Sequence, residues 1–186
     1  MVAPFRLFAL APLLGLAACA TESLGPTYGP SGTANPSAPM YHAGGGEDFR
    51  EGDFAWSRAS GAGAIDGVVT FRDGSTRYSC RGRDVILTPE TPWVRRRMYI
   101  LYGSIDGAVV PADIVRARTP QSGSGDYASY ARKTTCDGGN HFTFQGLPDG
   151  AWYVITLARP DDGSAGAVAI MRRVEVHGAG RQITLD

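Results

Sequence analysis

Lysine, histidine and cysteine are scarce in this chain of 186 residues, and charge of neither sign predominates. Eighteen basic residues balance 18 acidic ones, and Lys133 is the only lysine. A nucleic-acid-binding protein needs a strongly basic surface, so this balance argues against nucleic acid as the partner. The histidines, His42, His141 and His177, have no metal-ligand spacing and no cysteine pair beside them. We therefore expect no metal site and no cofactor.

The motifs of several enzyme classes are also missing. The serine-glycine segment reads Ser122-Gly123-Ser124-Gly125, which is not the G-x-S-x-G nucleophile elbow. Asp137-Gly138-Gly139-Asn140 and Asp161-Asp162-Gly163 lack the alternating oxygen ligands of a calcium loop, and turn chemistry explains both. We therefore expect a protein that binds rather than an enzyme.

The N-terminal segment has the features of an export signal. The apolar run from Leu7 to Ala17 is too short to span a bilayer. It ends in Leu16-Ala17-Ala18-Cys19, which resembles a bacterial lipobox. The resemblance implies a signal peptide over residues 1–18 and acylation of Cys19, and the following Ala20 implies the outer membrane. An ordinary secretory signal, cleaved at a small-x-small site, is the alternative.

Residues 19–53 are rich in Gly, Pro, Ser, Thr and Ala and have few apolar residues, which predicts a disordered linker. A flexible segment of this length spans roughly 30 Å between its ends. We therefore expect a lipid-anchored domain over residues 54–186, long enough to bury a core of its own.

The most apolar stretch of this domain runs from Asn140 to Leu157, and we expect the other strands to pack around it. Phe142 and Phe144 alternate with polar residues, Leu147 to Gly150 forms a turn, and Ala151 to Leu157 is a continuous apolar run. This pattern predicts a central hairpin with a strand covered on both faces. Trp152 is expected to be buried beside one of the two phenylalanines.

Short segments of strand character recur along the rest of the domain, separated by turn residues. They cover Phe54–Trp56, Ala64–Phe71, Thr76–Cys80, Val85–Leu87, Val109–Val115, Tyr127–Cys136, Val168–Val176 and Gln182–Leu185. Asp73-Gly74 predicts a hairpin turn, Gly67 a bulge, and Gln121 to Gly125 a loop. Short strands with frequent turns are typical of a β-sandwich, and we expect an all-β sandwich of about seven strands.

One segment has a helical pattern instead. Thr91 is a suitable N-cap with Pro92 after it, and Gly103 can end the helix. Between them, apolar residues recur at helical spacing, which predicts one short helix over Thr91–Gly103. A strand over Met98–Tyr102 is the alternative.

Two cysteines remain once Cys19 is assigned to the lipid. Cys80 and Cys136 each end an expected strand, and an even pair in an exported domain indicates a disulfide. The bond would join either adjacent strands or the two sheets, and it would contribute about 4 kcal/mol in the chain-entropy model. Two free thiols are the alternative.

A family resemblance supports the sandwich. The segments Ala64–Val69, Val85–Pro89, Asp137–Gly150 and Trp152–Val154 resemble the carboxypeptidase regulatory-like domain, which is transthyretin-like. The resemblance implies a transthyretin/immunoglobulin-like β-sandwich that acts as a non-catalytic accessory or binding module. Hydroxyisourate hydrolases share this fold, but they end in Tyr-Arg-Gly-Ser, whereas this chain ends in Ile-Thr-Leu-Asp.

One dense group of arginines remains as a candidate anion-binding site. Its members are Arg81, Arg83, Arg95, Arg96 and Arg97. Our first hypothesis is an interaction module for another envelope component. The alternative is a ligand-binding module that takes anionic glycans or lipid headgroups through these arginines and exposed aromatics such as Trp93. The arginines could also form a solvated face without a ligand, and an envelope hydrolase ranks last.

Overall fold

Ten strands, two α-helices and two 3-10 helices make up the part of the chain that the computed structural model describes, residues 48–120, 126–164 and 166–186. The elements in chain order are η1 (Glu51–Arg58), β1 (Gly63–Val69), β2 (Arg72–Asp73), β3 (Thr76–Ser79), β4 (Asp84–Pro89), α1 (Pro92–Tyr102), β5 (Gly107–Pro111), α2 (Ala112–Arg118), η2 (Tyr127–Tyr130), β6 (Arg132–Thr135), β7 (His141–Leu147), β8 (Gly150–Pro160), β9 (Val168–Val176) and β10 (Arg181–Leu185). The expected signal peptide, Cys19, and the loop Gln121–Gly125 lie outside the described residues.

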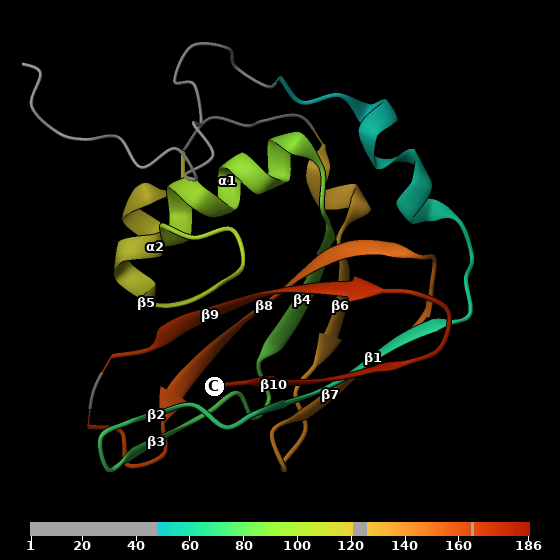
Figure 1. Cartoon of the computed structure of the whole chain (residues 1–186). Coiled ribbons are helices and arrows are strands. Elements are labelled where there is room, and N and C mark those ends of the chain that lie inside the picture. The colour runs from blue at the N-terminus through green and yellow to red at the C-terminus, as the bar shows by residue number, and fades with distance from the viewer. Residues whose placement is uncertain (1–47, 121–125, 165) are drawn as a thin grey trace, which may run out of the picture. The chain divides into compact units, whose positions relative to one another are not determined.

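The strands form two sheets, as Figure 1 shows. The small sheet has the order β10-β1-β7, with β10 parallel and β7 antiparallel to β1. In the large sheet of seven strands, β8 pairs with β4 and β9 along its length and with β3 near its end. The predicted all-β sandwich is confirmed, with ten strands in place of about seven.

Two hydrophobic cores lie on the two faces of the large sheet. The first core, between the sheets, contains Ile65, Phe142 and Phe144 of the small sheet and Trp152 and Val154 of β8. The second core joins α1, η1 and η2 to the opposite face of the large sheet. Figure 1 shows α1 and α2 on one side of the large sheet and β1, β7 and β10 on the other. The domain is therefore a sandwich with an additional helical layer.

The expected central strand is confirmed, but the expected hairpin is wrong. Trp152, Tyr153 and Val154 of β8 are fully buried. However, β7 pairs with β1 in the small sheet, so the turn from Leu147 to Gly150 carries the chain from one sheet to the other. The burial patterns of the two strands also differ, because β7 alternates between buried and exposed positions whereas Trp152 to Val154 of β8 are buried on both faces.

Helix α1 begins and ends where its capping residues predict. The Thr91 Oγ1 accepts a hydrogen bond of 3.1 Å from the Val94 N–H, and Pro92 occupies the first helical position. Gly103 has a φ of 74° and ends the helix in the left-handed conformation that glycine adopts without strain. The prediction of this helix is confirmed.

Three strand predictions were wrong in part, because helical segments occupy some or all of the residues expected to form strands. Phe54 to Trp56 lies in η1, and the expected strand after Tyr127 begins with η2 before β6. The ring centroids of Phe54 and Tyr130 are 4.7 Å apart, and the two rings pack together in the second core, so both helical turns contribute an aromatic side chain to it. The segment Val109–Val115 divides between β5 and α2.

The sequence predicts a bulge at Gly67, and this prediction is wrong. The register of β1 against β7 shifts between Gly63 and Ile65 instead. Gly67 lies opposite Phe142 on β7, and a Cβ atom at this position would overlap the Phe142 ring. The glycine is therefore required by the close approach of an aromatic ring.

The disulfide between Cys80 and Cys136 is confirmed, and it joins two segments at one end of the large sheet. Cys80 follows β3, and Cys136 follows β6 and exchanges backbone hydrogen bonds with the β3–β4 turn. Asn140, with a φ of 68°, lies beside the bond. Its side-chain oxygen accepts from the Ser79 hydroxyl at 2.6 Å, and its carbonyl accepts from the Val69 N–H of β1 at 3.0 Å. This end of the domain thus ties the two sheets together.

Gly67→Ala is expected to lower the free energy of unfolding by about 1–3 kcal/mol, because the new methyl group displaces the Phe142 ring in a packed core. Chemical denaturation measures the effect. Gly138→Ala is the matched control, since a Cβ there meets nothing within 4 Å, and it should change stability by less than about 0.5 kcal/mol. Equal effects in the two variants would contradict the packing role of Gly67.

Candidate functional site

The five arginines of the candidate anion site do not form one surface. Arg81 and Arg83 lie in the turn before β4, whereas the other three belong to α1, which follows the opposite end of that strand. The Arg81 Nε donates to the Gly138 carbonyl at 3.2 Å, beside the disulfide. The two groups are near each other in the sequence, but β4, which the sequence predicts, separates them by its whole length.

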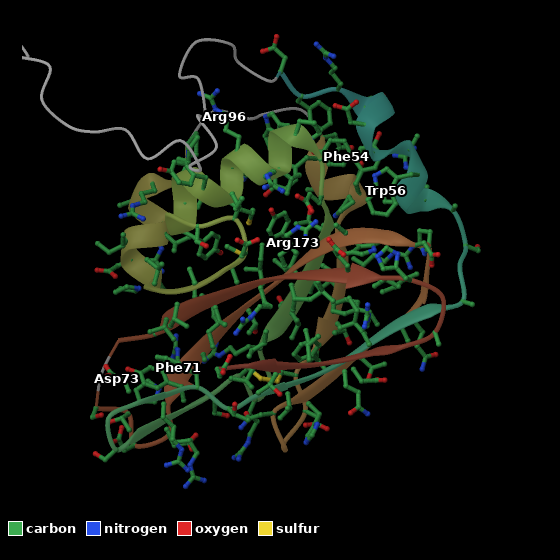
Figure 2. All side chains as sticks on the ribbon, in the orientation of Figure 1. Phe54, Trp56, Phe71, Asp73, Arg96 and Arg173 are labelled. Atoms are coloured by element: carbon green, nitrogen blue, oxygen red, sulfur yellow. A yellow bond between two sulfur atoms is a disulfide. The ribbon has the colours of Figure 1, made fainter. Side chains whose placement is uncertain are left out.

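Arg95 belongs to an ion-pair network that holds α1 against the large sheet. Its guanidinium lies 2.7 Å from the carboxylate of Glu90, whose side chain is only 12% exposed. The other Glu90 oxygen accepts from Arg173 of β9, and Arg173 also pairs with Glu175 at 2.8 Å. In Figure 2, Arg173 lies in the layer between α1 and the large sheet. This network fixes the helix relative to β9.

The network also sets the electrostatics of the residues around it. Tyr153 is fully buried, and burial together with the nearby Glu90 raises the pKa of its hydroxyl. The hydrogen bond from Arg173 lowers the pKa of Glu175 on the surface, with His177 adding to the effect. Sequence reasoning missed Glu90 and Arg173. The sequence did contain one signal for this ion pair. Glu90 stands between a buried strand and the helix N-cap Thr91, where a buried charge needs a partner.

Arg97 has a different environment, between two aromatic rings. Its guanidinium carbon lies 5.5 Å from the centroid of Trp93 and 5.1 Å from that of Tyr127, and the two ring centroids are 5.0 Å apart. Phe49 packs edge-on against Trp93, with 5.7 Å between the two ring centroids. We refer to Trp93, Arg97 and Tyr127 as the arginine–aromatic surface.

Two neighbouring side chains on α1, Met98 and Tyr102, are buried beside this surface. Tyr102, one helical turn after Met98, is buried, and burial and Tyr127 raise its pKa to about 12 despite the opposing effect of Arg97. Met98 itself is buried in the second core. The arginine–aromatic surface is therefore the partly exposed top of a packed cluster, and Arg97 is held there by cation–π contacts.

The chemistry that this surface offers is specific. A guanidinium presents a planar fork of N–H donors that matches the two oxygens of a carboxylate. The half-buried rings of Trp93 and Tyr127 offer apolar surface next to that fork. Arg96 lies on the side of α1 turned away from the sheet, as Figure 2 shows, and adds positive charge nearby.

The remaining sequence candidates lie elsewhere. The Asp137 carboxylate accepts from the Gly139 and His141 N–H groups, both at 2.8 Å, and these bonds lower its pKa, as expected of a turn aspartate. His177 lies 3.5 Å from Glu175. Among the described residues, no group of three or more His, Cys, Asp or Glu side chains could hold a metal ion. The helices of the described ranges are also too short or too polar to cross a membrane.

The described residues form a β-sandwich domain with a helical layer on one face of the large sheet. No protein-family model matches the chain, and no curated protein matches it. Among solved structures, it is similar to the crystal structure of a "putative carbohydrate binding protein" from Pseudomonas aeruginosa. The two are 22% identical with a TM-score of 0.52, and the match covers 74% of this chain and 97% of the other. This likeness concerns the fold.

Glu90→Gln is expected to destabilise the domain by about 1–3 kcal/mol, because it leaves Arg95 and Arg173 without their shared carboxylate in a partly buried site. Thermal or urea unfolding measures the loss. Asp84→Asn is the matched control, since the Asp84–Lys133 pair is more than half exposed on both sides and should contribute less than about 1 kcal/mol. If the two variants unfold alike, the network does not hold α1.

Proposed function

We propose that this chain is a lipid-anchored protein of the bacterial envelope whose domain binds acidic glycans at the arginine–aromatic surface. Binding would proceed without turnover. Residues 1–18 would be removed, Cys19 would carry the lipid, and the domain would work at the outer membrane. The carboxypeptidase regulatory-like domain that the sequence resembles is the family we propose for the sandwich.

The observation that carries this proposal is the position of Arg97 against two aromatic rings. A guanidinium held in place loses less conformational entropy when it binds than a freely moving side chain does. It can therefore bind the carboxylate of an acidic sugar with both N–H groups. The apolar C–H face of the same sugar can lie against the ring of Trp93 or Tyr127.

The likeness to the "putative carbohydrate binding protein" supports carbohydrate as the ligand class. It supports no particular residue, because 22% identity leaves the surfaces of the two proteins independent. Our first hypothesis, an envelope protein as the partner, stays a prediction. No contact within the described residues favours it over a glycan.

The lipid anchor would strengthen weak binding. Two or more acyl chains on Cys19 would hold the protein at the membrane, and the segment up to the domain would let it sample roughly 30 Å. Ligand in the same envelope layer would then be met at high effective concentration, so even a weak glycan affinity would be sufficient.

Arg97→Gln is expected to weaken the binding of oligogalacturonate at least about tenfold at low salt, since a charge-assisted pair contributes roughly 1.5–3 kcal/mol. Isothermal titration calorimetry measures the affinity, and raising the salt concentration should weaken binding to the wild-type chain. Arg159→Gln is the matched control, because Arg159 is exposed on β8 and lies apart from α1.

Arg97 is changed alone because the neighbouring arginines are not equivalent. Replacing Arg95 as well would remove its ion pair with Glu90, so a loss of stability could be mistaken for a loss of binding. Undiminished affinity of the Arg97→Gln chain, with its melting temperature preserved, would contradict the proposed site.

Mass spectrometry of the mature N-terminus should find a diacylated or triacylated Cys19, because the cysteine follows the lipobox-like Leu16-Ala17-Ala18. Cys19→Ser should release the protein from the membrane fraction. An unmodified chain that begins at Thr21 would instead identify an ordinary secretory signal.

A further inference from the structure

The outer face of the small sheet contains a hollow of about 310 Å³. It is lined by residues of all three strands: Asp66, Gly67, Val68, His141, Phe142, Thr143, Gln182, Ile183 and Thr184. The inner face of the same strands supplies the core, so the hollow lies on the side of the small sheet turned away from the large sheet. Its volume is at the lower end of the range for small-molecule sites.

The strand register arranges the polar side chains of this hollow in one row. Asp66 on β1 is paired with Thr143 on β7 and with Gln182 on β10. The three side chains point to the same face because they occupy directly opposite positions in neighbouring strands. A carboxylate, a hydroxyl and an amide therefore converge across the width of the sheet.

A second row lies beside the first. Val68 on β1 is paired with His141 on β7 and with Thr184 on β10. An imidazole and a hydroxyl thus flank a small apolar side chain. The two rows together offer hydrogen-bond donors and acceptors around an apolar patch, which is the combination found in sites for small polar ligands.

The hydrogen bonds within the hollow leave most of its polar groups available. The Thr143 Oγ1 donates to the Asp66 Oδ1 at 2.9 Å, which orients the carboxylate. The contacts of the described residues include no side-chain hydrogen bond for Gln182, Thr184 or His141. These groups can therefore bond to a ligand without breaking a bond within the domain.

The charge of the hollow selects the class of ligand. Asp66 is its one carboxylate, and no lysine or arginine lines it. An acidic sugar or a phosphate would meet repulsion from Asp66 without a compensating cation. A neutral sugar can instead donate hydroxyl hydrogens to the carboxylate and accept from the amide and the hydroxyls.

We propose that the outer face of the small sheet is a second binding site, which takes neutral carbohydrate. The proposal rests on the proposed function for the carbohydrate class, but it uses a different surface. Helices cover one face of the large sheet and the small sheet covers the other, so the two sites lie on opposite sides of the domain (Figure 1). A domain with both sites would hold an acidic and a neutral glycan segment at once.

The test uses the chain from residue 19 onward with Cys19→Ser, labelled with ¹⁵N, and three trisaccharide probes: maltotriose, chitotriose and trigalacturonate. At least one neutral probe is expected to shift the amide resonances of β1, β7 and β10, with little dependence on salt. Asp66→Asn and Thr143→Val should each weaken that binding at least fivefold. Thr135→Val, an exposed threonine on β6 outside the hollow, is the matched control.

The outcomes separate this site from the arginine–aromatic surface. Arg97→Gln should leave neutral-sugar binding unchanged. If neutral probes shift only resonances of α1 and η2, or if none binds, the second site is overturned whatever trigalacturonate does. If a neutral probe binds the small sheet while trigalacturonate does not bind, the second site stands and the proposed function of the arginine–aromatic surface fails.

Discussion

The large sheet is apolar on both faces, and the rest of the structure depends on covering both. In β8, Trp152 and Val154 point to the small sheet, whereas Tyr153 and Ile155 point to the helices. A strand with this composition cannot lie at a solvated face, because each large side chain left exposed would cost about 1.5–3 kcal/mol. The small sheet alone could cover only one side. The helical layer is therefore a requirement of β8 and not an addition to a finished sandwich.

The small sheet and the helical layer are held to the large sheet by different interactions. At one end of the domain, the disulfide and Asn140 fix the turns through which the chain passes between the sheets. On the other face, Glu90 joins α1 to Arg173 beside the buried hydroxyl of Tyr153. This ionic link places charge in a partly buried layer, and it stabilises the orientation of α1 only while all its members are present. Because Trp93 and Arg97 both belong to α1, the position of the arginine–aromatic surface depends on these ion pairs.

The sequence predicted correctly the elements whose ends are set by residues within the same segment. The capping residues Thr91 and Gly103 fix the ends of α1 within the segment itself, so the sequence was sufficient there. The hairpin expected around Leu147–Gly150 was wrong because pairing depends on which sheet each strand joins, and that choice is made by distant partners. The prediction that the five arginines form one anion-binding site was wrong for the same reason. Arg95 and Arg97 are two residues apart, yet one meets Glu90 and the other meets Tyr127, and only the fold decides this.

The difference between a helical layer and a small sheet also explains why the arginine–aromatic surface and the hollow on the small sheet differ in chemistry. A helix packed on a sheet exposes a broad outer side, on which long arginine side chains can reach aromatic rings, as Arg97 does. A three-stranded sheet exposes alternate residues at fixed spacing, and short polar groups such as Thr143 and Asp66 then meet across strands. The helical side consequently presents the guanidinium of Arg97 beside aromatic rings, whereas the sheet side presents one carboxylate, Asp66, among uncharged donors and acceptors. A ligand that bound at both proposed sites would have to reach around the domain, so the proposal favours two separate ligands or two segments of one long polymer.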